Sequence, residues 1–229
     1  MVRDAHQHTS KLSSLLLGGQ DGLVNVLGVI LGVAAASDDA RLVLVAGLAA
    51  AIAESISMAA VAYTATGAER ALYLSEHARE LRHIAEAPEL ERDEIRQIYG
   101  DKGFEGPLLD AIVATVTANP EVWVAVMMAE ELKLSPVDEK APLREALIVG
   151  VSALVGSLLP VAPFLLMALK SAVVVSLLIS AVALFGAGAY QARVTVGHWA
   201  RRGLELLLIG MGSALAGWLV GRALRLPPG

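Results

Sequence analysis

Seven residues of metal-binding type lie at helical spacings in the middle of the chain. Glu80 and His83 are three residues apart, as are Glu91 and Glu94, so each pair shares one helix face and can converge on one cation. A helical hairpin folded at Pro88 would bring the two pairs together. The full set is Glu80, His83, Glu91, Glu94, Met127, Met128 and Glu131.

The methionines add soft ligands to this set. Met127 and Met128 precede Glu131 by about one helical turn, so two thioethers and a carboxylate would meet on one side of a helix. Carboxylate, imidazole and thioether ligands together suit borderline divalent ions such as Fe²⁺ better than Ca²⁺ or Mg²⁺, which prefer oxygen alone. Two plainer interpretations stay open: the acids form a solvated face, and the methionines are core residues.

These residues belong to an acidic stretch from 67 to 140. It carries 16 of the chain's 23 Asp and Glu but only 8 of its 18 Lys and Arg. The segments on either side are long and nearly free of charge. An acidic subdomain set between apolar segments predicts a surface that concentrates cations at a membrane.

Composition narrows the class of protein. The chain has 229 residues, is 55% hydrophobic and has a mean hydropathy of +0.61, which is typical of polytopic membrane proteins. The absence of cysteine excludes thiolate zinc sites, iron–sulfur clusters and disulfides. A net charge of -5 argues against nucleic acid as a partner, because binding phosphates requires a basic face.

Five apolar segments are each near the ~20 residues that a helix needs to cross a bilayer. They cover residues 12–36, 42–66, 146–169, 171–190 and 204–224. Short turns predict antiparallel hairpins of the first with the second segment and of the third with the fourth. The expected fold is all-α: a polytopic membrane protein with five transmembrane helices and a helical cytoplasmic metal-binding subdomain between helices two and three. Its divisions are 1–66, 67–142 and 143–229.

The acidic stretch itself predicts helices. The first, over 68–86, continues the second apolar segment, and Pro88 then opens a helix to Tyr99. Loop glycines at 100, 103 and 106 come next. Further helices are expected over 107–118 and, after Asn119-Pro120, to about Leu134.

Two acids fall inside the apolar segments, where ionisable groups are expensive. Asp21 has Asn25 one turn on, and Glu54 has Met58 one turn on. An ionisable residue at membrane depth indicates a path for ions or protons. For Asp21 the alternative is a position near the interface, where it caps or snorkels.

Several motifs together carry a resemblance. They are Gly19-Gln-Asp21-Gly22, Ser57-Met58-Ala59, Tyr63 with Glu69, the Glu-rich helices, Met127-Met128 with Glu131, and Gly156 to Pro160 with Pro163. In this order and spacing they resemble the vacuolar iron transporter family over nearly the whole chain. The match is far more specific than any one motif.

The resemblance implies a homodimer of five-helix protomers that exports Fe²⁺, and sometimes Mn²⁺, from the cytosol in exchange for protons. It assigns the seven residues named at the outset to a cytoplasmic metal-binding domain, and Asp21 and Met58 to a pore at the dimer interface. Because Glu54 is also an acid at membrane depth, we expect it to assist Asp21 and Met58 there. Where the family has Glu, this chain has His83. Imidazole removes one negative charge and couples occupancy to pH.

Two other functions compete with transport. Glu80-x-x-His83 also resembles the Glu-x-x-His motif of di-iron carboxylate proteins, which would make this a membrane-attached ferroxidase. That chemistry normally uses two such motifs, and only one is present. The third option is a membrane anchor and interaction module, against which Asp21 and Glu54 argue because an anchor gains nothing from buried acids.

The remaining expectations concern partners and location. With a cytoplasmic N-terminus, Arg3, Lys11 and the arginines at 193, 201 and 202 fall inside, which favours this orientation with the C-terminus outside. The lipid bilayer, protons and divalent ions (Fe²⁺, Mn²⁺, Co²⁺ or Zn²⁺) are expected partners, and no prosthetic group is expected. Residue usage leans toward a bacterial plasma membrane, or a vacuolar membrane if the source is eukaryotic.

Overall fold

The computed structural model describes residues 6–195 and 197–225, with side chains from residue 12 onward. All regular structure in these residues is helical, which confirms the all-α class. Arg3 and the side chain of Lys11, which entered the predicted charge bias, lie outside the described part. The helices are α1 (His6–Ala36), α2 (Ala40–Glu86), α3 (Pro88–Asp101), α4 (Gly106–Thr117), α5 (Pro120–Glu130), α6 (Ala141–Val161), α7 (Pro163–Leu166), α8 (Leu169–Val194) and α9 (Trp199–Ala223).

Five of the described helices are long and apolar enough to cross a membrane, as the sequence predicts. They are α1 from Leu12, α2, α6, α8 and α9. Helices α4 and α5 together are also apolar enough, but their axes meet at 112° at the break between them. The protein is therefore a multi-pass integral membrane protein.

The chain forms two compact units. The membrane unit comprises the chain up to Tyr63 and from Leu143 onward, and the acidic unit comprises Thr64–Pro142. Helix α2 contributes to both units, because it continues without a break to Glu86. This continuity is the one predicted for the first helix of the acidic stretch.

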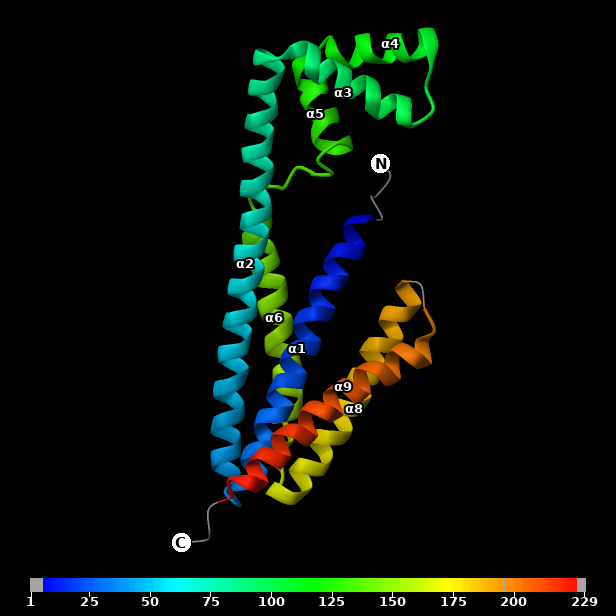
Figure 1. Ribbon diagram of the computed structural model, residues 1–229. Coiled ribbons are helices and arrows are strands. Elements are labelled where there is room, and N and C mark those ends of the chain that lie inside the picture. The colour runs from blue at the N-terminus through cyan, green and yellow to red at the C-terminus, as the bar shows by residue number, and fades with distance from the viewer. Residues whose placement is uncertain (1–5, 196, 226–229) are drawn as a thin grey trace. The chain divides into compact units, whose positions relative to one another are not determined.

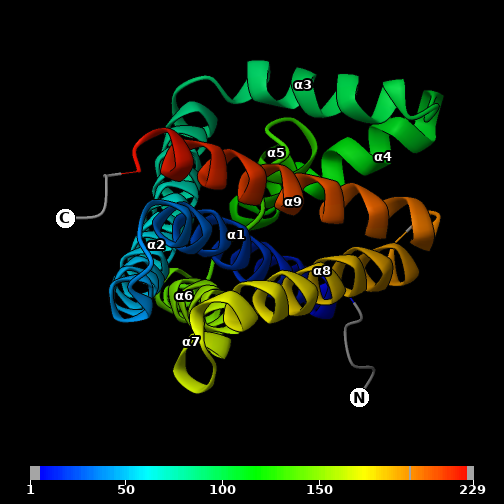
Figure 2. The same cartoon turned by 90° about the horizontal axis from the view of Figure 1, so that it is seen from below.

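Helix α1 lies at the centre of the membrane unit, between α2 with α6 on one side and α8 with α9 on the other (Figures 1 and 2). Glycines make this possible. A Cβ on Gly156 of α6 would collide with the carbonyl oxygen of Gly19, and one on Gly221 of α9 with that of Gly32. Small residues let membrane helices approach this closely, and packing then replaces the hydrophobic effect as the driving force.

The core of the membrane unit is built around the second half of α1. Leu27 and Ile30 are fully buried and pack with Val43 of α2 and Val161 at the end of α6. The outer surface is apolar as well, and α6 exposes a stripe of valine and leucine at four-residue spacing. Such a surface would be unstable in water but matches a hydrocarbon environment.

Several predicted segment bounds in the membrane unit are wrong. Helix α6 begins at Ala141 and not at 146, α8 ends at Val194 and not at 190, and α9 begins at Trp199 and not at 204. The third apolar segment does not run to Leu169: α6 ends at Val161, and the chain continues through α7 and an extended Met167. Pro163 begins α7 because it cannot continue the hydrogen-bond ladder of α6. Lys170, predicted to separate two segments, lies in the first turn of α8.

The acidic unit has its own apolar core. Ile84 of α2, Ile95 of α3, Val113 of α4 and Trp123 of α5 meet there. Gly103 and Gly106 have φ of 91° and 58°, as a glycine turn requires. The predicted loop begins later than expected, because α3 continues to Asp101 and Gly100 belongs to the helix.

The last helix of the acidic unit ends earlier than predicted. Helix α5 stops at Glu130, four residues before Leu134. The backbone closes the end of the helix when Leu132 N–H donates to the Met127 carbonyl and Lys133 takes a left-handed φ of 55°. Glu131 is consequently the capping residue and not a member of the helix.

Candidate metal centre

Three of the predicted ligands converge in the acidic unit. Glu80, His83 and Glu91 each offer one ligand atom, and these atoms lie within 4.8 Å of one another. His83 Nδ1 is 3.3 Å from Glu91 Oε1. A cation placed among them would have two carboxylates and an imidazole as ligands, which is a donor set suited to Fe²⁺, Mn²⁺ or Zn²⁺.

The local sequence explains this convergence. Helix α2 ends at Glu86, and Pro88 opens α3 with the φ angle that a first helical turn requires. Ala87 connects the helices and bonds to both, donating to the His83 carbonyl and accepting from Glu91 N–H. The chain therefore turns at Pro88, as predicted, and the turn brings His83 and Glu91 together. The predicted hairpin is not formed, because α3 runs across the end of α2 and does not fold back along it (Figure 1).

Burial makes the site unusual for an acidic surface. Glu80 and Glu91 are only 3% and 2% exposed, whereas His83 is exposed. Glu91 Oε2 has no hydrogen-bond partner within the described part of the chain. The nearest cationic group to Glu80 is Arg79, whose Nε is 3.9 Å from Oε1. Buried carboxylates are stable only when they are neutralised, so this cluster favours a cation or protons.

The electrostatics of the cluster point the same way. Burial, followed by the charges of Glu94 and Glu80, raises the pKa of Glu91 to about 7, while His83 opposes the rise. Desolvation, followed by the charges of Glu94 and Glu80, also raises the pKa of Glu131. Four carboxyl groups thus repel one another in the metal-free unit, and a divalent cation would relieve that repulsion.

The other four predicted ligands lie outside the cluster of Glu80, His83 and Glu91. Glu94 is partly exposed one turn beyond Glu91, and Glu131 is exposed after the end of α5. Met127 is fully buried in the apolar core of the acidic unit, and Met128 is 1% exposed. The core packing of Met127 fits its plainer interpretation, and the ligand roles of both methionines stay predictions.

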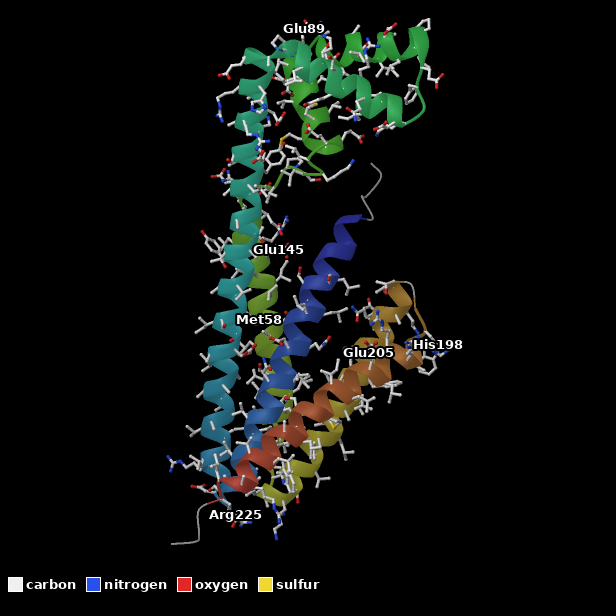
Figure 3. The ribbon with its side chains drawn as sticks, in the orientation of Figure 1. Met58, Glu89, Glu145, His198, Glu205 and Arg225 are labelled. Carbon is white, nitrogen blue, oxygen red and sulfur yellow. The ribbon has the colours of Figure 1, made fainter. Side chains whose placement is uncertain are left out.

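The predicted pore residues gather in the membrane unit. Asn25 Nδ2 of α1 donates to Glu54 Oε1 of α2 at 3.0 Å, and Asp21 lies beside Glu54. All three come from the middle of membrane-spanning helices. Met58 follows Glu54 by one turn on α2 (Figure 3). The structure therefore brings Asp21 and Glu54, which the sequence analysis assigned to one pore, close together. Their roles in metal or proton transfer stay predictions.

One acid in the membrane unit was missed. Ser14 Oγ of α1 donates to Glu145 Oε2 of α6 at 2.9 Å (Figure 3). Ser14 and Asp21 are seven residues apart, so they share one face of α1. The predicted segment began at 146, whereas α6 begins at Ala141, so Glu145 lies inside a span. An acid directly before an apolar run was the signal available.

Fold and site together define a multi-pass membrane protein with a cluster of two buried carboxylates and an exposed imidazole in one unit and paired polar groups within its spans. The model of the VIT family matches residues 12–222. The chain belongs to the VIT family.

Curated relatives share nearly the full length. A protein from Oryza sativa subsp. japonica named vacuolar iron transporter 1 is 30% identical over 212 residues, which cover 92% of this chain and 84% of the relative. Its namesake from Arabidopsis thaliana is 29% identical, with 92% and 85% covered. The vacuolar iron transporter of Toxoplasma gondii is 30% identical over 71% of this chain and 55% of its own length.

Proposed function

We propose that this protein exports divalent transition metal, Fe²⁺ and also Mn²⁺, from the cytosol in exchange for protons. Membership of the VIT family supports metal-ion transport by a protein that is not an enzyme. The observation that carries the choice of ion is the cluster of Glu80, His83 and Glu91, whose mixed oxygen and nitrogen donors suit these metals. Co²⁺ and Zn²⁺ fit the same donors.

In this proposal the two units have different tasks. The acidic unit collects metal on the cytoplasmic side, and its excess of carboxylates raises the local concentration of cations. Asp21, Glu54 and Met58 form the station within the membrane, where carboxylates alternate between proton and metal and the thioether adds a neutral, soft ligand. Two protomers form the pore as a homodimer, with the N-terminus inside and the C-terminus outside.

The ferroxidase alternative receives less support. The described residues contain a single cluster of three metal-ligand side chains, built on one Glu-x-x-His motif. A di-iron carboxylate centre normally draws on two such motifs from facing helices.

The proposed function is tested with the full-length protein in liposomes that contain a pH-sensitive dye. An imposed proton gradient, acidic inside, should drive Fe²⁺ or Mn²⁺ into vesicles in which the acidic unit faces outward, and the lumen should become alkaline as metal enters. Entry of metal without any proton movement would contradict proton exchange and indicate that the protein transports metal alone. No metal entry under any gradient would contradict it.

Glu145 provides a narrower prediction in the same assay. Its hydrogen bond to Ser14 places a carboxylate two turns before Asp21 along α1, a position suited to metal on its way to the pore. We expect Glu145→Gln to lower metal flux about tenfold, because the amide keeps the bond to Ser14 but loses the charge. Glu205→Gln, which removes an exposed acid from α9, is the matched control. Equal flux in both variants would assign Glu145 a packing role only.

A further inference from the structure

An apolar groove runs along the membrane unit between α1, α6 and α8. Its volume is about 600 Å³, and its walls are almost wholly hydrocarbon. Leu147, Val151 and Val155 line it from α6 and are each 59% exposed. From Leu147 to Leu159 the groove follows α6 for about 18 Å. That length is close to the roughly 15 Å of hydrocarbon in one leaflet of a bilayer.

One end of the groove meets an aromatic boundary. Ala187 of α8 lines the groove, and the next residue, Gly188, packs directly on the backbone of Arg202 in α9. Trp199 opens α9, contacts Phe185 edge-on at 6.1 Å between ring centroids, and is 47% exposed. Exposed tryptophan is typical of the level of lipid headgroups. The groove thus ends where the headgroup region begins.

Positive charge gathers at the same end. Arg193 in the last turn of α8 and Arg201 and Arg202 in the first turn of α9 are all exposed. His198 directly precedes α9 and Glu205 follows Arg202 within it (Figure 3). Arg202 pairs with Glu205 at 2.9 Å, whereas Arg193 and Arg201 form no ion pair with any residue that the structure describes. No Asp or Glu occurs from 171 to 204. An anion would therefore find two guanidinium groups that no carboxylate in the described residues already pairs with.

We propose that this groove and the adjoining ends of α8 and α9 bind one anionic phospholipid. The acyl chain lies in the groove, and Arg193 and Arg201 hold the phosphate at the level that Trp199 marks. Arginine suits the phosphate because its planar donors can bond two oxygens at once. The site uses none of the candidate metal ligands, so it stands apart from the proposed transport function.

The test compares full-length protein in nanodiscs of phosphatidylcholine with and without phosphatidylglycerol. Phosphatidylglycerol should raise Tm by about 4–8 °C, given roughly 1 kcal/mol for each arginine near an anionic surface. Native mass spectrometry should find one retained phosphatidylglycerol per chain. R193Q/R201Q should lose both effects, and Ala187→Phe should lose both by filling the groove.

The matched control is R41Q/K170Q, which removes two exposed cations elsewhere on the membrane unit and should keep both effects. Equal loss in the control and in R193Q/R201Q would mean a general response to surface charge and would overturn the proposal. Equal stabilisation by soluble glycerol phosphate would overturn the role of the groove. A change of oligomeric state in Ala187→Phe, with lipid retention unchanged, would assign the groove to a second copy of the chain.

Discussion

Replacing Asp21 by Asn should abolish metal-driven proton exchange in liposomes while metal binding to the acidic unit stays unchanged. The amide preserves the shape of the side chain and its ability to accept a hydrogen bond, but it cannot release a proton or offer a full charge to a cation. Asp21 lies beside Glu54, which already accepts from Asn25, so the variant keeps a polar neighbourhood. We expect flux to fall at least a hundredfold, to the background of empty vesicles.

Two further variants separate the contributions of Glu54 and Met58 to the proposed metal site in the membrane, and a third variant is a control. Glu54→Gln should weaken flux less than Asp21→Asn, because Asn25 can still hold the amide in place. Met58→Ala should reduce the preference for Fe²⁺ over hard ions more than it reduces turnover, since it removes a soft neutral ligand. Asp38→Asn, in the exposed turn before α2, is the control. Near-normal coupled flux in Asp21→Asn would place the path elsewhere and leave Glu54 as the next acid to test.

The membrane-spanning helices could be predicted because hydropathy is a local property of the chain. Each membrane-spanning helix can be predicted because it contains about twenty apolar residues in sequence. The turn from Ser37 to Asp39 can be predicted because Asp is a common capping residue, and the Asp39 side chain does cap α2. The close packing of Gly19 on Gly156 could not be predicted from local hydropathy. It depends on which faces of distant helices meet, and spacing within one helix does not determine that.

Two helix ends were wrong for a similar reason. Apolar composition continues from Val161 to Leu169, so hydropathy alone extends the third segment past the break at Pro163. Nothing in the composition of α5 signals the left-handed Lys133, because a positive φ is uncommon for lysine and is imposed here by the closing hydrogen bonds. The ends of α5 and α6 are both determined by the direction in which the chain continues after the helix, which local composition does not encode.

The candidate metal centre was predictable in outline. Spacing placed Glu80 with His83 on one face, and Pro88 supplied the turn that brings Glu91 to them. Burial was not predictable, because an acidic helix in isolation favours a solvated face. The core formed by Ile84 and Ile95, each close in sequence to the cluster, draws the carboxylates inward.

Glu91 is the residue of the acidic unit whose replacement should have the largest effect on metal binding. It is 2% exposed and belongs to the cluster with Glu80 and His83, whereas the side chain of Glu89, two residues earlier on α3, is 82% exposed. We expect Glu91→Gln to weaken binding of Mn²⁺ or Zn²⁺ by about a hundredfold or more, and Glu89→Gln to change it less than threefold. Isothermal titration calorimetry on the purified full-length protein measures both. Equal losses would indicate a diffuse acidic surface.

The same substitution should change how stability depends on pH. Burial, with Glu94 and Glu80, raises the pKa of Glu91 from 4.5 to about 7 in the folded, metal-free unit. Because the folded state holds this proton more tightly than the unfolded state, the contribution is fully present below pH 4.5 and is lost as pH rises through about 7. The metal-free acidic unit should therefore lose up to roughly 3 kcal/mol of stability between pH 5 and pH 8.

Trp123 can report this change selectively, because it is 4% exposed in the core of the acidic unit and the chain's other two tryptophans, Trp199 and Trp218, can be replaced by Phe. In that background the thermal transition of Trp123 fluorescence should shift upward as pH falls from 8 to 5. Glu91→Gln should flatten the shift and stabilise the unit at pH 8, because a neutral amide leaves no charge to bury. Saturating Mn²⁺ should stabilise the unmodified cluster most at pH 8, where the carboxylate needs no deprotonation. A metal-free transition that does not respond to pH would mean that Glu91 stays ionised and that the cluster is hydrated.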